Sequence, residues 1–115
     1  EIEMTCYETL FVVKPTLTEE EIKAQIAKIQ EILAKVNAEL LATDEIGMRQ
    51  LAYEVQKQKR GYYTVLYYKA NGDAIAEIER NLRINEDVIK FLTVKYVNGK
   101  EVAQFNKQVE AANNK

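Results

Sequence analysis

Residues 61–69 restrict the possible folds most, because both faces of this segment are apolar. They read Gly-Tyr-Tyr-Thr-Val-Leu-Tyr-Tyr-Lys. Successive side chains of a β-strand point to opposite faces, so the segment divides into one face with Tyr62, Thr64, Leu66 and Tyr68 and another with Tyr63, Val65 and Tyr67. An antiparallel strand with a solvated side alternates apolar and polar residues. We therefore expect this strand, residues 62–69, to be covered on one side by its own core and on the other by something else.

Residues 39–55 are expected to form the preceding strand, and a basic turn joins the two. Gly47 lies inside this strand, and a glycine in that position indicates a bulge or a bend. The turn contains Lys57, Lys59 and Arg60. The pattern therefore predicts a long hairpin with cations at its tip.

The other patterns complete the order strand, helix, strand, strand, helix, strand. Residues 6–13 form a first strand, which ends before Pro15 because proline cannot donate to the ladder. Thr18 and Glu21 form a capping box at the start of a helix with one apolar stripe. A turn at 71–73 begins the second helix, and residues 88–97 form the last strand. With right-handed crossovers, this order predicts an α+β, ferredoxin-like βαββαβ sandwich, a four-stranded antiparallel sheet with two helices on one face.

A chain of 115 residues is expected to form one domain. We assign residues 1–98 to a ferredoxin-like domain and residues 99–115 to a polar C-terminal tail. The tail carries Val102, Phe105 and Val109 at helical spacing, a pattern that fits either a short docking helix or a frayed end. One interpretation of Glu1-Ile2-Glu3, which precede Met4, is a remnant of expression.

Missing residue types exclude several function classes. The chain has no histidine and no serine, so it lacks the commonest general base and metal ligand as well as a serine nucleophile. Neither of the common phosphate-binding glycine motifs occurs. The single cysteine, Cys6, is interpreted as a packed thiol in a reducing cytosol. We expect no enzymatic activity, no metal and no cofactor, and, without a membrane-length apolar run or a signal-peptide pattern, a cytoplasmic location.

The net charge of −2 is unevenly distributed along the chain. Residues 1–47 carry ten acids and four bases, residues 48–69 carry one acid and five bases, and the remainder carries seven of each. Such an asymmetry favours one local anionic contact over general binding of polyanions.

Six motifs occur in an order and at spacings that are specific in combination. They are Tyr7-Glu8, Lys14-Pro15-Thr16-Leu17, Gly47-Met48-Arg49-Gln50-Leu51-Ala52-Tyr53, Lys59-Arg60-Gly61-Tyr62-Tyr63, Leu82-Arg83-Ile84-Asn85-Glu86-Asp87-Val88 and Phe91-Leu92-Thr93-Val94-Lys95. With these motifs, residues 4–96 resemble the bacterial small-subunit ribosomal protein S6 family. The resemblance implies the same ferredoxin-like sandwich and a structural role without catalytic residues. It also implies binding to small-subunit ribosomal RNA together with ribosomal protein S18.

Six cations are the candidates for contact with that RNA: Arg49, Lys57, Lys59, Arg60, Arg83 and Lys90. Arginine pairs bidentately with phosphate, and lysine acts as a point charge. Other roles remain open. The basic turn could simply be solvated, Arg49 could support the bend at Gly47, and Arg83 and Lys90 could pair with nearby acids.

The resemblance places Tyr62 and its neighbours toward the helices, so the opposite face of the sheet points outward. We expect the apolar side chains of this outward face to bind the partner protein: Leu10, Val12, Tyr63, Val65, Tyr67, Leu92 and Val94. Exposed apolar patches of more than a few hundred Å² usually mark interfaces.

Three other interpretations of the function are weaker than an RNA-binding ribosomal protein. Residues 60–67 partly match the signature of RNA-recognition motifs, whose sheet aromatics stack on bases, but Thr64 replaces one stacking aromatic and Tyr62 is expected to face inward. An acylphosphatase is rejected because no glycine loop follows the first strand. The remaining alternative is a protein-interaction or homo-oligomerising module with no role in RNA binding.

Overall fold

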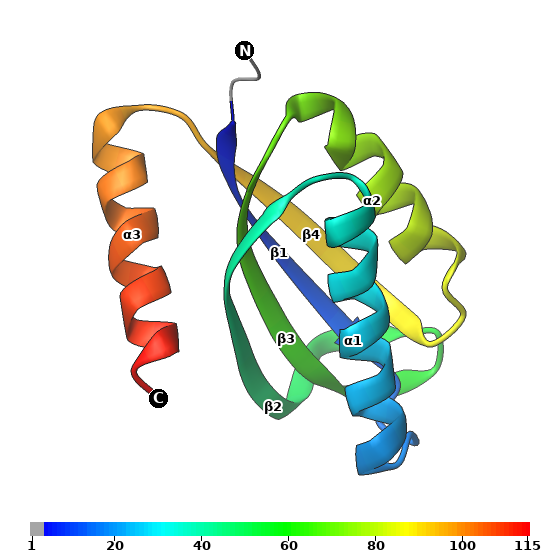
Figure 1. The fold of residues 1–115 in the computed structure, drawn as a ribbon. Helices are drawn as coiled ribbons and strands as arrows, with labels where there is room; N and C mark the ends of the chain where they lie inside the picture. The colour runs from blue at the N-terminus through cyan, green and yellow to red at the C-terminus, as the bar shows by residue number, and fades with distance from the viewer. Residues whose placement is uncertain (1–3) are drawn as a thin grey trace.

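The structure is a computed structural model that describes residues 4–115, and Glu1-Ile2-Glu3 lie outside the described residues. The strands and helices follow one another in the expected order, with one further helix at the C-terminus (Figure 1). The elements are β1 (Thr5–Val13), α1 (Glu19–Lys35), β2 (Glu39–Val55), β3 (Gln58–Ala70), α2 (Gly72–Ile84), β4 (Val88–Tyr96) and α3 (Gly99–Asn113). Within residues 4–115, no helix is both long enough and apolar enough to cross a membrane.

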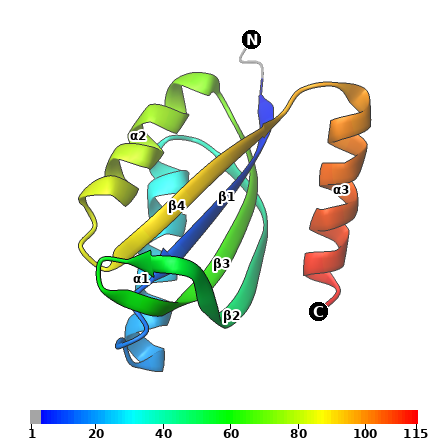
Figure 2. The ribbon, with the colours of Figure 1, turned by 180° about the vertical axis from the view of Figure 1, so that it is seen from behind.

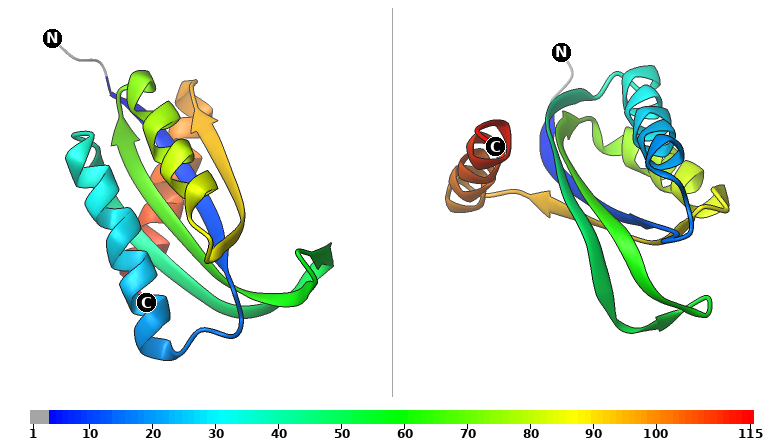
Figure 3. Two further views of the ribbon diagram at one scale, coloured as in Figure 1. Left: turned by 90° about the vertical axis from the view of Figure 1, so that its right-hand side faces the viewer. Right: turned by 90° about the horizontal axis from the view of Figure 1, so that it is seen from below.

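The four strands form one antiparallel sheet in the order β2-β3-β1-β4, so β3 and β1 are central and β2 and β4 are edges. The helices α1 and α2 lie together on one face, and α3 lies on the other (Figures 2 and 3). This arrangement confirms the predicted ferredoxin-like sandwich, and it adds a helix to the face that the prediction left open.

The start of α1 follows directly from the sequence. The Thr18 hydroxyl accepts a hydrogen bond from the Glu21 backbone N–H at 3.2 Å, and the Glu21 carboxylate accepts one from the Thr18 N–H at 2.8 Å. These bonds lower the pKa of Glu21. The reciprocal pair satisfies two of the backbone donors that a helix N-terminus leaves free.

The main core lies between the sheet and the α1–α2 pair. Tyr68 and Leu66 of β3 are fully buried in it, and Tyr62 packs against its edge, as the predicted strand register requires. The Tyr68 hydroxyl lies 2.7 Å from the Thr9 hydroxyl of β1, which gives its polar end a partner inside the core. Burial raises the pKa of Tyr68 to about 12, despite the opposing effect of that hydrogen bond.

The β2–β3 hairpin is longer than predicted at its tip. Gln56 and Lys57 form the turn with φ angles of 49° and 65°, and β3 already starts at Gln58. The left-handed region is normally occupied by Gly, Asn or Asp in such turns, so the sequence carried no signal for so short a turn. Gly47 has a φ of 103° and sits at a register shift of β2, which confirms the predicted bulge.

The C-terminal helix α3 packs on the outward face of the sheet. The Phe105 side chain is completely buried, with its ring centroid 5.9 Å from Tyr67 and 5.2 Å from Tyr96. Asn98 and Glu101 form a capping box at its start, which lowers the pKa of Glu101. Of the two possibilities for the tail, the structure therefore has the docking helix.

The hairpin covers the opposite end of the same face. The end of β2 bends toward β1. Its Leu51 and Val55 side chains pack with Val12 and Ile89 in one small apolar cluster. Seen from behind, the hairpin tip lies beside the start of β4 (Figure 2). The outward face is thus covered at one end by α3 and at the other by the hairpin.

Candidate nucleic-acid interface

The basic residues of the hairpin lie along its distal half. Lys57 occupies the turn itself, whereas Lys59 and Arg60 belong to β3, which corrects their predicted place on the turn. Arg60 pairs with Gln50 across the ladder, and Arg49 pairs with Gly61. The four cations Arg49, Lys57, Lys59 and Arg60 are exposed. The Arg49 guanidinium also donates to the Met48 carbonyl at 3.0 Å, next to the bulge at Gly47.

The two remaining cations come from the other side of the molecule and meet the hairpin tip. Arg83 lies in the last turn of α2 and Lys90 near the start of β4. Both line a shallow hollow of about 300 Å³, together with Gln56 of the hairpin turn and the apolar residues Leu82, Val88, Ile89 and Phe91. Residues separated by about thirty positions in the sequence therefore share one surface, at the end of the molecule where the hairpin lies beside the α2–β4 loop (Figure 2).

Aromatic rings hold both of these cations. The Arg83 guanidinium carbon lies 5.9 Å from the centroid of the Phe91 ring, and the Lys90 Nζ atom lies 5.1 Å from the centroid of the Tyr53 ring. These distances are within the range of cation–π attraction.

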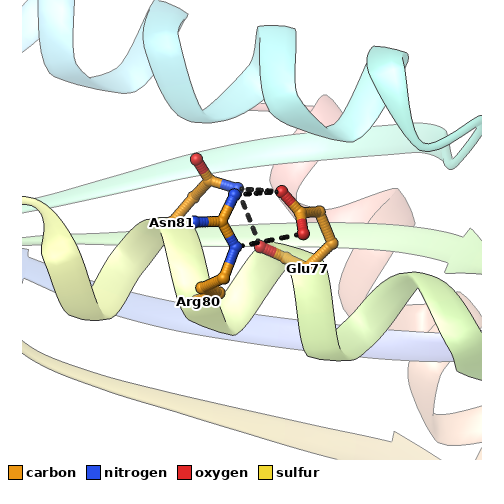
Figure 4. A network of polar contacts seen from close by, with 3 residues as sticks. All are labelled: Glu77, Arg80 and Asn81. Carbon is orange, nitrogen blue, oxygen red and sulfur yellow. Dashed lines mark hydrogen bonds and ion pairs between the residues drawn. The ribbon is translucent and has the colours of Figure 1, made fainter.

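In the part of the chain that the structure describes, the six cations have no ionic partner. Within residues 4–115, none of them lies within 4.0 Å of a carboxylate, unlike Lys23, Lys35, Arg80 and Lys115. Arg80 illustrates the contrast: it donates to Glu77 at 2.6 and 3.1 Å on the same helix, and Asn81 completes the network (Figure 4). These bonds lower the pKa of Glu77 and raise that of Arg80. The alternative in which Arg83 and Lys90 pair with nearby acids is therefore not observed among residues 4–115.

The predicted partner surface is only partly accessible. Val12, Val65 and Tyr67 are buried, Leu10 and Tyr63 are half-buried, and Leu92 and Val94 are 56% and 38% exposed. The expectation of an open outward face is wrong for the buried three, because α3 covers Val65 and Tyr67 and the hairpin covers Val12. A strip formed by Leu10, Leu92 and Val94 remains between the two covers.

Tyr53 is a surface residue that sequence reasoning did not single out. Its side chain is 65% exposed beside Lys90. Alternation along β2 puts it on the same face as Leu51 and Val55, so the pattern gave no sign that it would be the exposed member of the three. The irregular pairing of β2 between Gln50 and Val55 breaks that alternation.

Comparison with known proteins places the chain among small-subunit proteins. A family model described as Ribosomal protein S6 matches residues 6–95. A relative from Sulfurovum sp., named small ribosomal subunit protein bS6, is 78% identical over 110 residues, covering 96% of this chain and 87% of the relative. A protein of the same name from Helicobacter acinonychis is 49% identical over 112 residues, covering 97% and 79%. The crystal structure of 30S ribosomal protein S6 from Thermotoga maritima has the same fold, with a TM-score of 0.81, 24% identity, and coverage of 94% of this chain and 99% of that one.

Proposed function

This chain belongs to the ribosomal protein S6 family, whose members are structural components of the small ribosomal subunit and not enzymes, and we propose that it binds small-subunit ribosomal RNA together with ribosomal protein S18. It acts in the cytoplasm as part of the ribosome. Its contribution is to hold RNA and partner in one arrangement, so no reacting group is required.

The observation that carries the RNA contact is the set of six cations at one end of the molecule, of which five are exposed and Lys90 is half-buried. Four come from the distal hairpin and two from the facing α2–β4 region, and none of the six has an ionic partner within residues 4–115. A cation without an internal partner gives up no ion pair when it binds phosphate. Phosphate contacts of this kind position a protein on RNA without reading its sequence.

Net charge explains why a partner is needed. The protein carries −2 overall, so its field at long range opposes approach to RNA, and the basic end acts only at short range because salt screens charges beyond about 8–10 Å. Binding to RNA should therefore be weak for the isolated protein and stronger once S18 supplies further contacts.

The partner contact is proposed for the exposed strip on the outward face. Leu92 and Val94 of β4 lie side by side with Leu10 of β1 through the strand pairing of Leu10 with Leu92. Val12, Val65 and Tyr67 are buried by the chain itself and are not part of this strip.

The test is a titration of small-subunit ribosomal RNA with this protein, with and without S18 of the same organism, at several salt concentrations. We expect tighter binding with S18 and an affinity that falls with salt. The triple variant Lys57→Ala, Lys59→Ala, Arg60→Ala should reduce the salt slope by roughly one for each phosphate that the variant no longer neutralises.

The control removes cations from α1 instead of from the hairpin. Lys23→Ala with Lys35→Ala removes two exposed lysines of α1, each already paired with a glutamate, and should leave RNA affinity unchanged. Equal RNA affinity with and without S18, or equal reductions in both variants, would contradict the proposal. Failure of the protein to co-purify with small-subunit particles would favour the interaction module without an RNA role.

A further inference from the structure

Tyr53 is placed where an aromatic ring has no role in the core. Among residues 4–115, it is the one aromatic side chain with most of its surface in solvent, at 65%. A surface tyrosine ring leaves a large apolar area in contact with water, whereas the other tyrosines of the described chain are at least half-buried. Its position beside the basic hollow is therefore a reason to ask what it binds.

The ring is held in place from one side. Lys90 lies over it at 5.1 Å from the centroid, and the segment that carries it is anchored by Leu51 and Val55, which pack against Val12 and Ile89. A ring with an ammonium over one face and this much exposure keeps its other face available for stacking. The anchoring reduces the conformational entropy that would be lost when a ligand stacks on it.

The groups around the ring match what a nucleotide presents. Lys90 and Arg83 line the adjacent hollow and can neutralise phosphates. Gln56 also lines the hollow, and a glutamine amide has both a donor and an acceptor for the edge of a base. Aromatic rings interleaved with cations form the usual platform for single-stranded nucleic acid, because every base has a π-face.

We propose that Tyr53 stacks on one unpaired base of the bound RNA, while Lys90 and Arg83 hold the flanking phosphates. This assignment rests on the proposed RNA function and adds a base contact to its phosphate contacts. The site lies on the hairpin edge and not on the sheet face, where α3 and its Phe105 cover Tyr67.

The experiment compares two single-stranded probes of equal length at low salt: a fluorescently labelled adenosine oligoribonucleotide and an abasic oligomer with the same phosphates. The intact chain should bind the adenosine oligomer at least about fivefold more tightly, the effect of stacking on one base. Tyr53→Leu should abolish this preference, and Tyr53→Phe should retain it. Lys90→Ala should weaken binding of both oligomers, with Lys23→Ala as its matched control.

Three results would overturn the site: equal affinity of the intact chain for both oligomers, a preference that survives in Tyr53→Leu, or no binding of either oligomer at low salt. Circular dichroism of each variant checks that the fold is intact. We expect the Tyr53 variants to fold, because the Tyr53 side chain is exposed. The first two results leave phosphate binding by the cations standing. Failure of the proposed function itself is seen separately, as the absence of ribosomal RNA binding by this protein with S18.

Discussion

Gly61 is the glycine with the least room for a side chain. A β-carbon at this position would overlap Cγ1 of Val12 and would lie 3.4 Å from the Val13 carbonyl oxygen. Its φ is not positive, so the requirement for glycine here is one of space and not of backbone conformation. The close approach brings β3 against the buried Val12 side chain of the neighbouring strand β1, at the point where the distal hairpin begins.

Replacing Gly61 by alanine should therefore destabilise the protein. Val12 is fully buried and cannot swing away, so we expect a decrease of about 1–3 kcal/mol in the free energy of unfolding, the range for overpacked cores. The midpoint of urea denaturation measures it.

Gly99→Ala is the matched control, because no atom would lie within 4 Å of its β-carbon. It begins α3, where alanine should raise stability by about 0.4–1 kcal/mol through the unfolded state. Equal midpoints for the two variants would show that the Val12 contact is not tight.

At the scale of elements, the sequence predicted β1, β2 and β4 to within a residue or two at each end, and it predicted the start of α1. Their signals are local: the capping box at Thr18, the stripe of α1, and Pro15 beyond β1. It missed what depends on tertiary contacts. The stripe of Val102, Phe105 and Val109 indicates a helix but not the sheet surface on which that helix docks. The turn at Gln56 and Lys57 has no glycine or asparagine to reveal it.

The docking of α3 depends mainly on Phe105. Beyond the apolar contacts, Asn113 donates to the Leu41 carbonyl at 3.2 Å, and Lys115 pairs with Asp44 at 2.8 Å on the surface. The Tyr96 hydroxyl donates to Glu8, and burial together with this carboxylate raises the pKa of Tyr96. Exposed ion pairs contribute at most about 1 kcal/mol, so the aromatic contacts dominate.

Phe105→Ala should release α3 from the sheet. Truncating a buried phenylalanine costs about 3–5 kcal/mol in a core, which exceeds what the peripheral bonds of α3 supply. We expect amide hydrogen exchange in α3 to accelerate while the central strands β1 and β3 stay protected. Lys107→Ala, on the exposed side of the same helix, should change little. Unaltered protection of α3 in Phe105→Ala would mean that the helix is held by other contacts.

At the scale of the whole molecule, the two proposed contacts lie on different surfaces. The cations gather at the hairpin end, and the apolar strip lies on the outward face between the hairpin and α3. The six cations were all identifiable from the sequence, but their convergence was not, because it depends on how the hairpin curls beside α2 and β4. The extent of the strip was overestimated, because the two covers come from segments that the pattern did not place.

The double variant Leu92→Lys and Val94→Lys should weaken association with S18 without unfolding the protein. Both side chains are exposed, so lysines are tolerated there, while charges at the centre of an apolar contact are not. Isothermal titration calorimetry with S18 measures the decrease in affinity, which we expect to reach at least about tenfold.

Leu40→Lys with Val97→Lys is the control, because these side chains are 38% and 67% exposed away from the strip. If both double variants bound S18 as tightly as the unmodified protein, the partner surface would have to lie elsewhere.

The interior position of β1 has a consequence for biosynthesis. Thr9 of β1 contacts Tyr68 and Thr93, which follow it by 59 and 84 residues. At about 5–20 residues per second of translation, the first strand waits for several seconds before its second neighbour has been made. Closing such distant pairings is slow compared with forming local helices. β3 can pair with β1 first, so the nascent chain must keep the other edge of β1 from aggregating until β4 emerges, and α3 can cover the outer face only after β4 has been made.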